Sequence, residues 1–317
     1  MNQRYRIKNW SEYNKSLIHR GSITFWFSND VTAKWHSNSY TGKKGRPKTY
    51  SDDAILCILL IRTIFRLPLR ALQGFVYSLI YMLSLPISEP SYTQICRRAR
   101  DLGKLLKNLS AKRPTDIVFD STGFKVYGER EWKVKKHGHS KRRVWRKIHI
   151  GMDPDSGEII MGEMTGNGNG SGDAEAAERL LKDTPKSIER IIGDGSYDGF
   201  SFRKSVESMR AELIVPPPIN AVVHESQDPA VVKRNNALLE IEGLGNDSEA
   251  RALWKKLKGY HRRPLVETTM FRLKQLTGNT LQSREWVRQH VEVYIKCLIV
   301  NKVTRLGMPK GSWELVA

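Results

Sequence analysis

At residue 113 the sequence changes from helical periodicity to short strand-forming segments, and this change constrains the fold more than any other feature. Five segments of strand length follow, at residues 116–127, 142–152, 158–165, 188–192 and 212–215. Helical stretches at 174–182 and 200–210 separate the last three of them. Three consecutive strands, then helix, strand, helix and strand, predict an α/β fold class with a mixed five-stranded sheet in RNase H-like order.

Upstream of this sheet, residues 51–112 are predicted to form a helical region. Ser51 is a helix N-terminal signal, and further helical segments follow at 69–83 and 92–106. The last of these carries Arg97 and Arg98, so we expect a helix-turn-helix-like DNA-binding region. The alternative is that the three helices have only a structural role.

The two ends of the chain complete the predicted domain organisation. Residues 1–50 show no clean period and are interpreted as an N-terminal arm and basic linker. Arg46 in this linker precedes a proline, which is typical of segments that enter the DNA minor groove, although a solvated linker has the same composition. Residues 113–317 form the predicted catalytic domain, in which a locally acidic stretch marks an insertion at about 219–257.

The charge of the chain indicates a polyanionic partner. The sequence has 53 Lys and Arg against 33 Asp and Glu, a formal net charge of +20. These basic residues recur along the whole chain, which favours double-stranded DNA over an anionic membrane. The longest apolar run, 54–65, is interrupted by Arg62 and is too short to span a bilayer. With three widely separated cysteines, the chain is expected to work in a reducing cytoplasm.

Three acidic residues are candidates for catalysis and metal binding: Asp120, Asp194 and Glu267. The two aspartates end apolar strands, and Glu267 is the only acid between Arg251 and Lys274, a stretch with eight Lys or Arg. Carboxylates at strand ends converge at one edge of a sheet, and three hard oxygen donors suit Mg²⁺ or Mn²⁺. Two such ions would suit phosphodiester cleavage, in which both the attacking and the leaving oxygen need stabilisation.

The neighbours of Glu267 suggest a surface for DNA phosphates. Tyr260, Arg263, Glu267 and Lys274 are spaced so that, on one helix, they fall within an arc of ~60°. Arg263 and Lys274 are then expected to hold phosphates while Glu267 faces the metal. Pro264 favours the first helical turn, however, so Tyr260 is also compatible with a position just before the helix.

A basic segment between the first two strands is a further candidate for DNA contact. Residues 130–149 contain nine Lys or Arg and one acid. The proposed contacts are Lys135, Lys136, Arg142 and Arg143, with Trp132 and Trp145 stacking on exposed bases. The alternative for the tryptophans is packing against the sheet. A glycine-rich run at 166–172 lacks the Lys-Ser/Thr of a nucleotide-binding loop, so we do not expect ATP use.

The spacing Tyr260-x2-Arg263-x3-Glu267-x6-Lys274 resembles the signature of bacterial insertion-sequence DDE transposases. Together with residues 118–123 (VFDSTG) and 193–198 (GDGSYD), it resembles the insertion-sequence-five (IS-five) family of these enzymes. The resemblance implies an RNase H-like fold in which Asp120 bridges two Mg²⁺ ions while Asp194 and Glu267 each complete one.

The function that this resemblance implies, together with the three carboxylates and the basic charge, is that of a DNA transposase. It would bind terminal inverted repeats, nick the element ends with metal-activated water, and join the 3′-hydroxyl to target DNA by transesterification. A homo-oligomer on DNA is expected because two ends must be joined, and the expected location is the bacterial cytoplasm, in association with the nucleoid. Two alternatives stay open: a related nuclease or resolvase that hydrolyses without joining, and a non-enzymatic DNA-binding regulator.

Overall fold

The structure is a computed structural model in which residues 3–37, 47–104, 109–126, 145–166, 168, 170–182, 184 and 187–315 are described. The chain divides into two compact units, one of residues 1–106 with 298–317 and one of residues 107–297. Several of the predicted DNA contacts lie outside the described residues: Arg46, Trp132, Lys135, Lys136, Arg142 and Arg143.

The first unit begins with regular structure, where the sequence predicts an irregular arm. It contains β1 (Gln3–Ile7), α1 (Trp10–His19), α2 (Ile23–Trp26) and α3 (Asn29–Ala33). Strand β1 pairs antiparallel with β8 (Gly311–Leu315) at the other end of the chain. The segment therefore contains regular elements although its sequence shows no clean period, because a strand that pairs with a residue range about 300 positions away has no local signal.

The three helices predicted for this unit are confirmed. They are α4 (Asp52–Phe65), α5 (Leu69–Met82) and α6 (Tyr92–Asp101), the last followed by the short turn η1 (Leu102–Lys104). The Ser51 hydroxyl accepts a hydrogen bond from the Ala54 N–H, and Ser91 with Gln94 forms a capping box at the start of α6. These caps explain why the helices begin where the sequence indicates.

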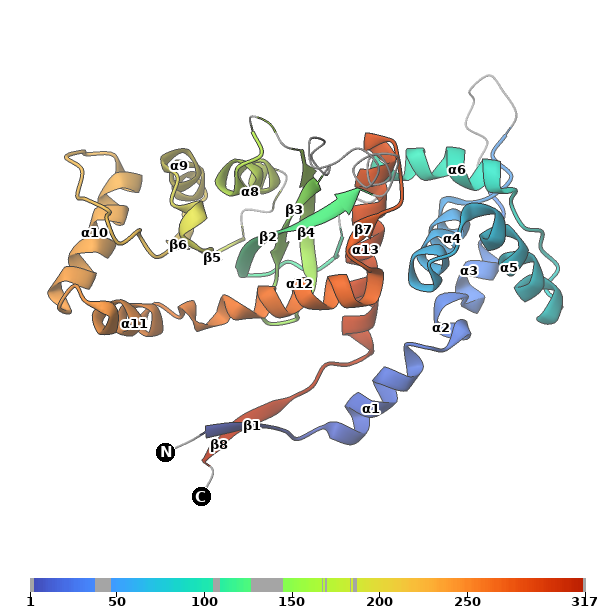
Figure 1. Cartoon of the computed structure of the whole chain (residues 1–317), viewed down its shortest axis with the longest axis horizontal. Coiled ribbons are helices and arrows are strands. Elements are labelled where there is room, and N and C mark those ends of the chain that lie inside the picture. The colour runs from blue at the N-terminus through green and yellow to red at the C-terminus, as the bar shows by residue number, and fades with distance from the viewer. Residues whose placement is uncertain are drawn as a thin grey trace, which may run out of the picture. The chain divides into compact units, whose positions relative to one another are not determined.

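The second unit contains the predicted sheet. Its strands are β2 (Asp116–Val126), β3 (Trp145–Met152), β4 (Ile159–Thr165), β5 (Arg190–Ile192) and β6 (Glu212–Ile214), in the order β4-β3-β2-β5-β6. The first three are antiparallel, whereas β5 and β6 run parallel to β2, so the RNase H-like order is confirmed (Figure 1). A sixth strand, β7 (Thr280–Leu281), pairs with β2 and was not predicted, because two residues carry no periodicity.

Helices cover both faces of this sheet. Figure 1 shows α8 (Asp173–Lys182) and α9 (Phe200–Ser208) on one face and α12 (Pro264–Thr277) along the other. Alternate residues of β2 point to opposite faces, so Phe119 packs with Tyr197 and Phe202 beneath α8 and α9. Asp120, its neighbour in sequence, faces α12.

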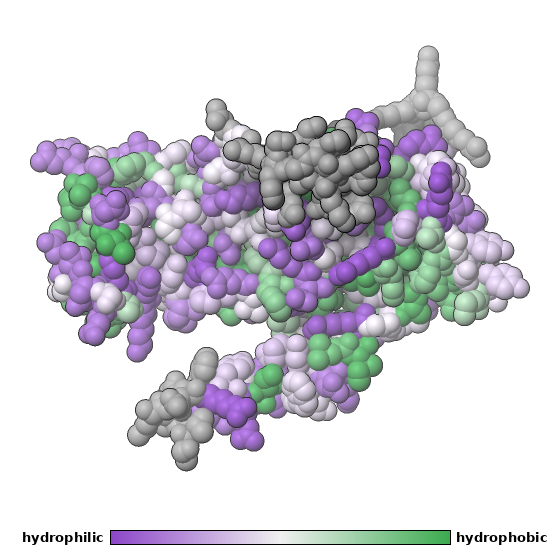
Figure 2. Space-filling model, viewed as in Figure 1, coloured by the Kyte–Doolittle hydropathy of each residue, from purple (hydrophilic) through white to green (hydrophobic). Residues whose placement is uncertain are grey.

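The predicted insertion folds as helices. It contains α10 (Pro229–Gly243) and α11 (Ser248–Leu257), and the turn η3 (Tyr260–Arg262) joins it to α12. The insertion also exposes apolar side chains, among them Ile219, Leu239 and Leu257, and Figure 2 shows hydrophobic residues at the end of the view where α10 lies in Figure 1. The last helix, α13 (Trp286–Leu306), contains the division between the two units. Within the described ranges, no helix combines the length and apolar character needed to cross a membrane.

Candidate active site

The parallel register of β2 and β5 places Asp120 beside Asp194. The last paired residues are Val118 and Ile192, and each aspartate lies two residues further along its chain. Residues two apart on a strand share a face, so both carboxylates are directed to the face that α12 covers. One detail of the prediction is corrected: β2 does not end at Asp120 but continues to Val126, and only its pairing with β5 ends there.

Asp194 follows β5 and begins the turn η2 (Gly195–Tyr197). Its Oδ1 accepts a hydrogen bond of 2.9 Å from the Ser196 N–H, so the carboxylate caps this short turn. The second oxygen, Oδ2, faces Arg263 at the start of α12. The local sequence therefore fixes the orientation of this side chain.

Arg263 connects all three predicted catalytic carboxylates. Its Nη2 lies 3.4 Å from Asp120 Oδ1 and 3.2 Å from Asp194 Oδ2. Its Nη1 forms an ion pair with Glu267, one helical turn further along α12. The guanidinium is largely buried, and the structure thus brings Asp120, Asp194 and Glu267 together around one cationic group.

The three carboxylates are possible ligands of a divalent cation. Among the described residues, no three His, Cys, Asp or Glu side chains form a metal-ligand cluster. In the triad of Asp120, Asp194 and Glu267, the Arg263 guanidinium lies between the three carboxylates and supplies their counter-charge. Three carboxylates from three elements are the hard oxygen donors that Mg²⁺ and Mn²⁺ prefer, so the donor set fits such an ion once Arg263 moves aside.

Helix α12 packs against strand β2, but Tyr260 is not part of this helix. Tyr260 lies in η3 and Pro264 is the first residue of α12, so the predicted common helical face holds only for Arg263, Glu267 and Lys274. The Lys274 ammonium lies 5.9 Å from the centre of the Phe124 ring, four residues beyond Asp120 on β2. Tyr260 instead packs beneath Lys255, whose ammonium is 5.5 Å from its ring.

Burial and like charges change the acidity of the site. Burial raises the pKa of Asp120 above its ordinary value, and the nearby carboxylates of Asp194 and Asp173 raise it further. The Ser121 backbone and Arg263 oppose this shift without cancelling it. Burial likewise raises the pKa of Tyr260. A cation close to Asp120 therefore favours the ionised form of this buried carboxylate.

Asp173 is a fourth acidic residue near the site that the sequence analysis missed. Its Oδ2 accepts a hydrogen bond of 2.8 Å from Lys147 Nζ, and its Oδ1 lies 3.1 Å from His149 Nδ1. His149 is buried, and its other nitrogen lies 2.8 Å from Thr165 Oγ1. Burial raises the pKa of Asp173, but hydrogen bonds from His149, Lys147 and Ser121 outweigh it and leave the pKa well below its usual range. An aspartate at the start of a helix after a glycine run was the available signal.

The described DNA-contact candidates differ in their surroundings. Arg97 is exposed on α6. Arg98 donates a 2.7 Å hydrogen bond to the Tyr50 carbonyl and pairs with Asp52, so it ties α6 to the start of α4. Trp145 is 39% exposed at the start of β3 and lies over Gly123, and its indole is therefore neither free in solvent nor buried in the core.

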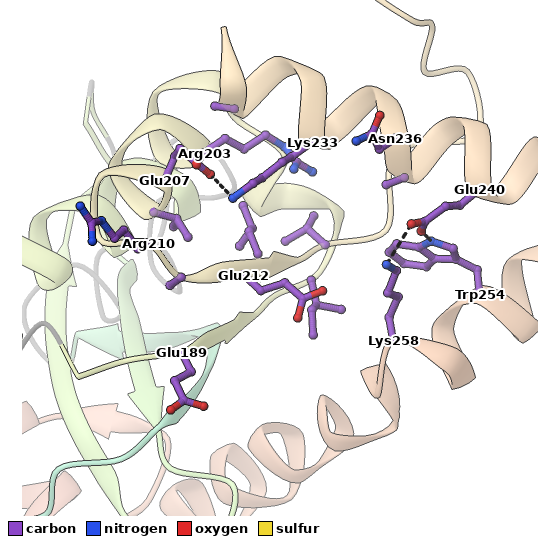
Figure 3. Close-up of a pocket in the computed structure, with 17 residues that line it drawn as sticks. Glu189, Arg203, Glu207, Arg210, Glu212, Lys233, Asn236, Glu240, Trp254 and Lys258 are labelled. Carbon is purple, nitrogen blue, oxygen red and sulfur yellow. Dashed lines mark hydrogen bonds and ion pairs between the residues drawn. The ribbon is translucent and has the colours of Figure 1, made fainter.

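A cavity of about 400 Å³ lies apart from the triad. It is bordered by β6, α9, α10 and α11 (Figure 3). Ion pairs cross its rim, at 2.6 Å between Lys233 and Glu207 and at 3.0 Å between Lys258 and Glu240. None of the three catalytic candidates lines this cavity. Its mixed charges are mostly paired, and we assign it no role in the chemistry.

Comparisons with known proteins place the chain in a family. Among solved structures it is similar to a piggyBac transposase in a synaptic complex with hairpin DNA, at 10% identity and a TM-score of 0.38, over 94% of this chain and 76% of that one. It is similar to a Drosophila P element transposase in a strand transfer complex, at 10% identity and a TM-score of 0.26, over 94% and 85% of the two chains. A family model described as "Transposase DDE domain" matches residues 18–129, and a second with the same description matches residues 111–302, more than half of the sequence. The chain belongs to the DDE transposase family.

Proposed function

We propose that this protein is the transposase of a bacterial insertion sequence of the IS-five type, which binds terminal inverted repeats, nicks the element ends and joins the 3′-hydroxyl to target DNA. The observation that carries the proposal is that Asp120, Asp194 and Glu267 meet around Arg263 in a chain of the DDE family. Three carboxylates held by a sheet and a helix are suited to ions for phosphoryl transfer.

The proposed cofactor is Mg²⁺, two ions, with Mn²⁺ as a substitute. Asp120, Asp194 and Glu267 would hold them. When bound, such ions activate the attacking oxygen and stabilise the leaving one. The raised pKa of Asp120 favours this role, because a cation relieves the cost of its buried charge.

The remaining residues of the signature are proposed to hold the DNA strand. Lys274 lies beside Phe124 on β2, beyond Asp120, and would supply a counter-charge for a phosphate next to the scissile one. Arg263 would exchange its carboxylate partners for a phosphate when metal is bound. Tyr260 would lie next to the same DNA strand. Trp145 and the exposed Arg97 are proposed as contacts further from the chemistry, whereas Arg98 is assigned to the tie between α6 and α4.

The broader organisation is part of the same proposal. Residues 51–112 would recognise the repeats and residues 113–317 would carry the chemistry, with the helices of 219–257 as an insertion. A homo-oligomer on DNA is proposed because both ends of the element must be held for joining. The bacterial cytoplasm, next to the nucleoid, is the proposed location.

The test is cleavage of a labelled duplex that carries the terminal repeat flanking the gene, in Mg²⁺, Mn²⁺ or EDTA. We expect nicking that requires metal and falls by about 10³-fold or more in Glu267→Gln, because one ligand of the site is lost. Glu249→Gln is the matched control, since Glu249 is an exposed glutamate on α11. Pre-cut ends with a plasmid target then test joining.

Two outcomes contradict the proposal. Nicking without joined product from pre-cut ends would assign the protein to the hydrolytic nucleases. Specific binding of the repeat with no cleavage in either metal would assign it to the DNA-binding regulators.

A further inference from the structure

A second charged cluster lies on β2, four residues before the catalytic aspartate. Asp116 is 1% exposed and accepts two hydrogen bonds from Arg190, of 3.0 Å from Nε and 2.6 Å from Nη2. Arg262, which immediately precedes Arg263, also forms an ion pair with Asp116 through Nη1. A single buried carboxylate thus binds two guanidinium groups from different elements.

Like the candidate active site, this cluster is formed where β2 lies beside β5, but it lies four residues earlier on both segments. Asp116 is paired in register with Arg190, and four residues later Asp120 lies beside Asp194. The consecutive residues Arg262 and Arg263 contact these two levels of β2 separately. On a strand that rises by ~3.3 Å per residue, the levels are about 13 Å apart and lie on the same face.

We propose that Arg262 is a positioning residue, which fixes the start of α12 along β2 by binding Asp116 and thereby places Arg263 and Glu267 against Asp120 and Asp194. This inference rests on the proposed function, because the residues that Arg262 would position are those of the proposed metal site. It adds to that function a residue outside the four-residue signature.

The local structure shows why such an anchor is needed. Gly259, between the C-cap of α11 and η3, adopts the left-handed conformation with φ of +73°, so the chain turns sharply between the insertion and η3. Helix α12 begins without a side-chain cap. Its residues Val266 and Leu273 are buried, and the ion pair of Arg262 with Asp116 adds a directed contact just before the helix begins.

The second contact of Arg262 reaches the turn between β3 and β4. Its Nη2 forms an ion pair with Asp155, whose side chain is 70% exposed. An exposed pair of this kind contributes little on its own, so the buried contact with Asp116 is the one expected to determine the position. Arg262 nevertheless links the start of α12 to two separate parts of the sheet.

The test compares Arg262→Gln with Arg190→Gln in the full-length protein. Both substitutions remove one guanidinium from Asp116, and both are expected to lower the Tm by similar amounts. Only Arg262→Gln is expected to increase amide hydrogen exchange in residues 264–270 without metal or DNA. In the nicking assay it should lower the rate about tenfold or more, since a small misplacement of reacting groups has effects of this size. Arg190→Gln should stay within about threefold of wild type, and Arg262→Lys should recover part of the lost rate because it keeps a cation for Asp116.

Equal effects of the two glutamine variants on exchange in residues 264–270 would overturn the inference and leave the cluster a stabilising one. The exchange comparison needs neither nicking nor metal, so it decides the positioning role even when the wild-type protein fails to cut. Failure of wild-type nicking with an Arg262-specific exchange effect would reject the proposed function and keep the anchor.

Discussion

Arg263 Nη2 donates to Asp194 Oδ2 across 3.2 Å, which joins the start of α12 to a residue just beyond strand β5. The same guanidinium contacts Asp120 and Glu267, so the positive charge between the three acids is supplied by the protein itself. Under the proposed function, a divalent ion at these acids would compete with Arg263 for them. The arginine would then be available to a phosphate, which would link metal binding and DNA binding through one side chain.

Competition between Arg263 and the metal predicts a gain of metal affinity in Arg263→Gln. Removing the guanidinium leaves three carboxylates with no internal counter-charge, so Mn²⁺ should bind about tenfold more tightly than in wild type. Binding of the repeat duplex should weaken at the same time. Mn²⁺ titration by calorimetry and DNA titration by fluorescence anisotropy measure the two effects. Weaker Mn²⁺ binding in this variant would show that Arg263 supports the metal site.

The raised pKa of Asp120 predicts that Asp120→Asn stabilises the metal-free protein at neutral pH. Burial raises this pKa above 3.8 in the folded state, so ionisation of Asp120 opposes folding as the pH rises through its folded pKa. The variant lacks this cost, and its Tm should exceed that of wild type at pH 7, by about 2–4 °C for each kcal/mol removed. The difference should shrink toward pH 4. Thermal unfolding in EDTA across this range, with Glu249→Gln as control, measures it, and a lower Tm at pH 7 would contradict it.

The lowered pKa of Asp173 predicts the opposite pH dependence of stability from that of Asp120. Its folded pKa is lowered by hydrogen bonds from His149, Lys147 and Ser121, which outweigh burial, so the ionised form stabilises the fold. This contribution is fully present above the ordinary value of 3.8 and is lost as the pH falls toward the folded pKa. Asp173→Asn should therefore be destabilised at pH 7, by about 1–3 kcal/mol, and less so below pH 4. Urea unfolding at both pH values checks this against Glu175→Gln, an exposed acid on the same helix. A deficit that does not change with pH would point to packing alone.

The central sheet and the helices that cover it could be predicted from local sequence patterns, whereas the short or distant strands β1, β7 and β8 could not. Strands β2 to β4 and helices α8, α9 and α12 carry enough periodic residues to be predicted from sequence, and β5 and β6 lie within the short strand-like segments 188–192 and 212–215. Strand β1 pairs with β8 about 300 residues away, and β7 has two residues, so neither has a local signal. The same reasoning explains Tyr260: Pro264 indicated where α12 begins, and the structure places Tyr260 before it in a separate turn.

At the site, the three acids and Arg263 were candidates from the sequence, whereas Asp173 and Arg262 were not. Asp120, Asp194 and Glu267 stand out because each interrupts an apolar or basic surrounding. Asp173 and Arg262 look like ordinary surface charges in sequence, since charged residues are mostly exposed. Their importance depends on which strand residues face α8 and α12, and only the register between sheet and helices reveals it.

The net charge of +20 predicts that DNA affinity falls steeply with salt, because each phosphate contact releases counterions. The logarithm of the binding constant should fall linearly with that of the salt concentration. Lys274→Gln should lower the magnitude of this slope by about one, as expected for the loss of one phosphate contact. Lys233→Gln is the matched control, since Lys233 is exposed but already paired with Glu207 at 2.6 Å and lines the cavity away from the triad. Anisotropy titrations at four salt concentrations measure the slopes. A flat response in wild type would reject phosphate contacts as the main source of affinity, and equal losses in both variants would show that Lys274 acts through overall charge alone.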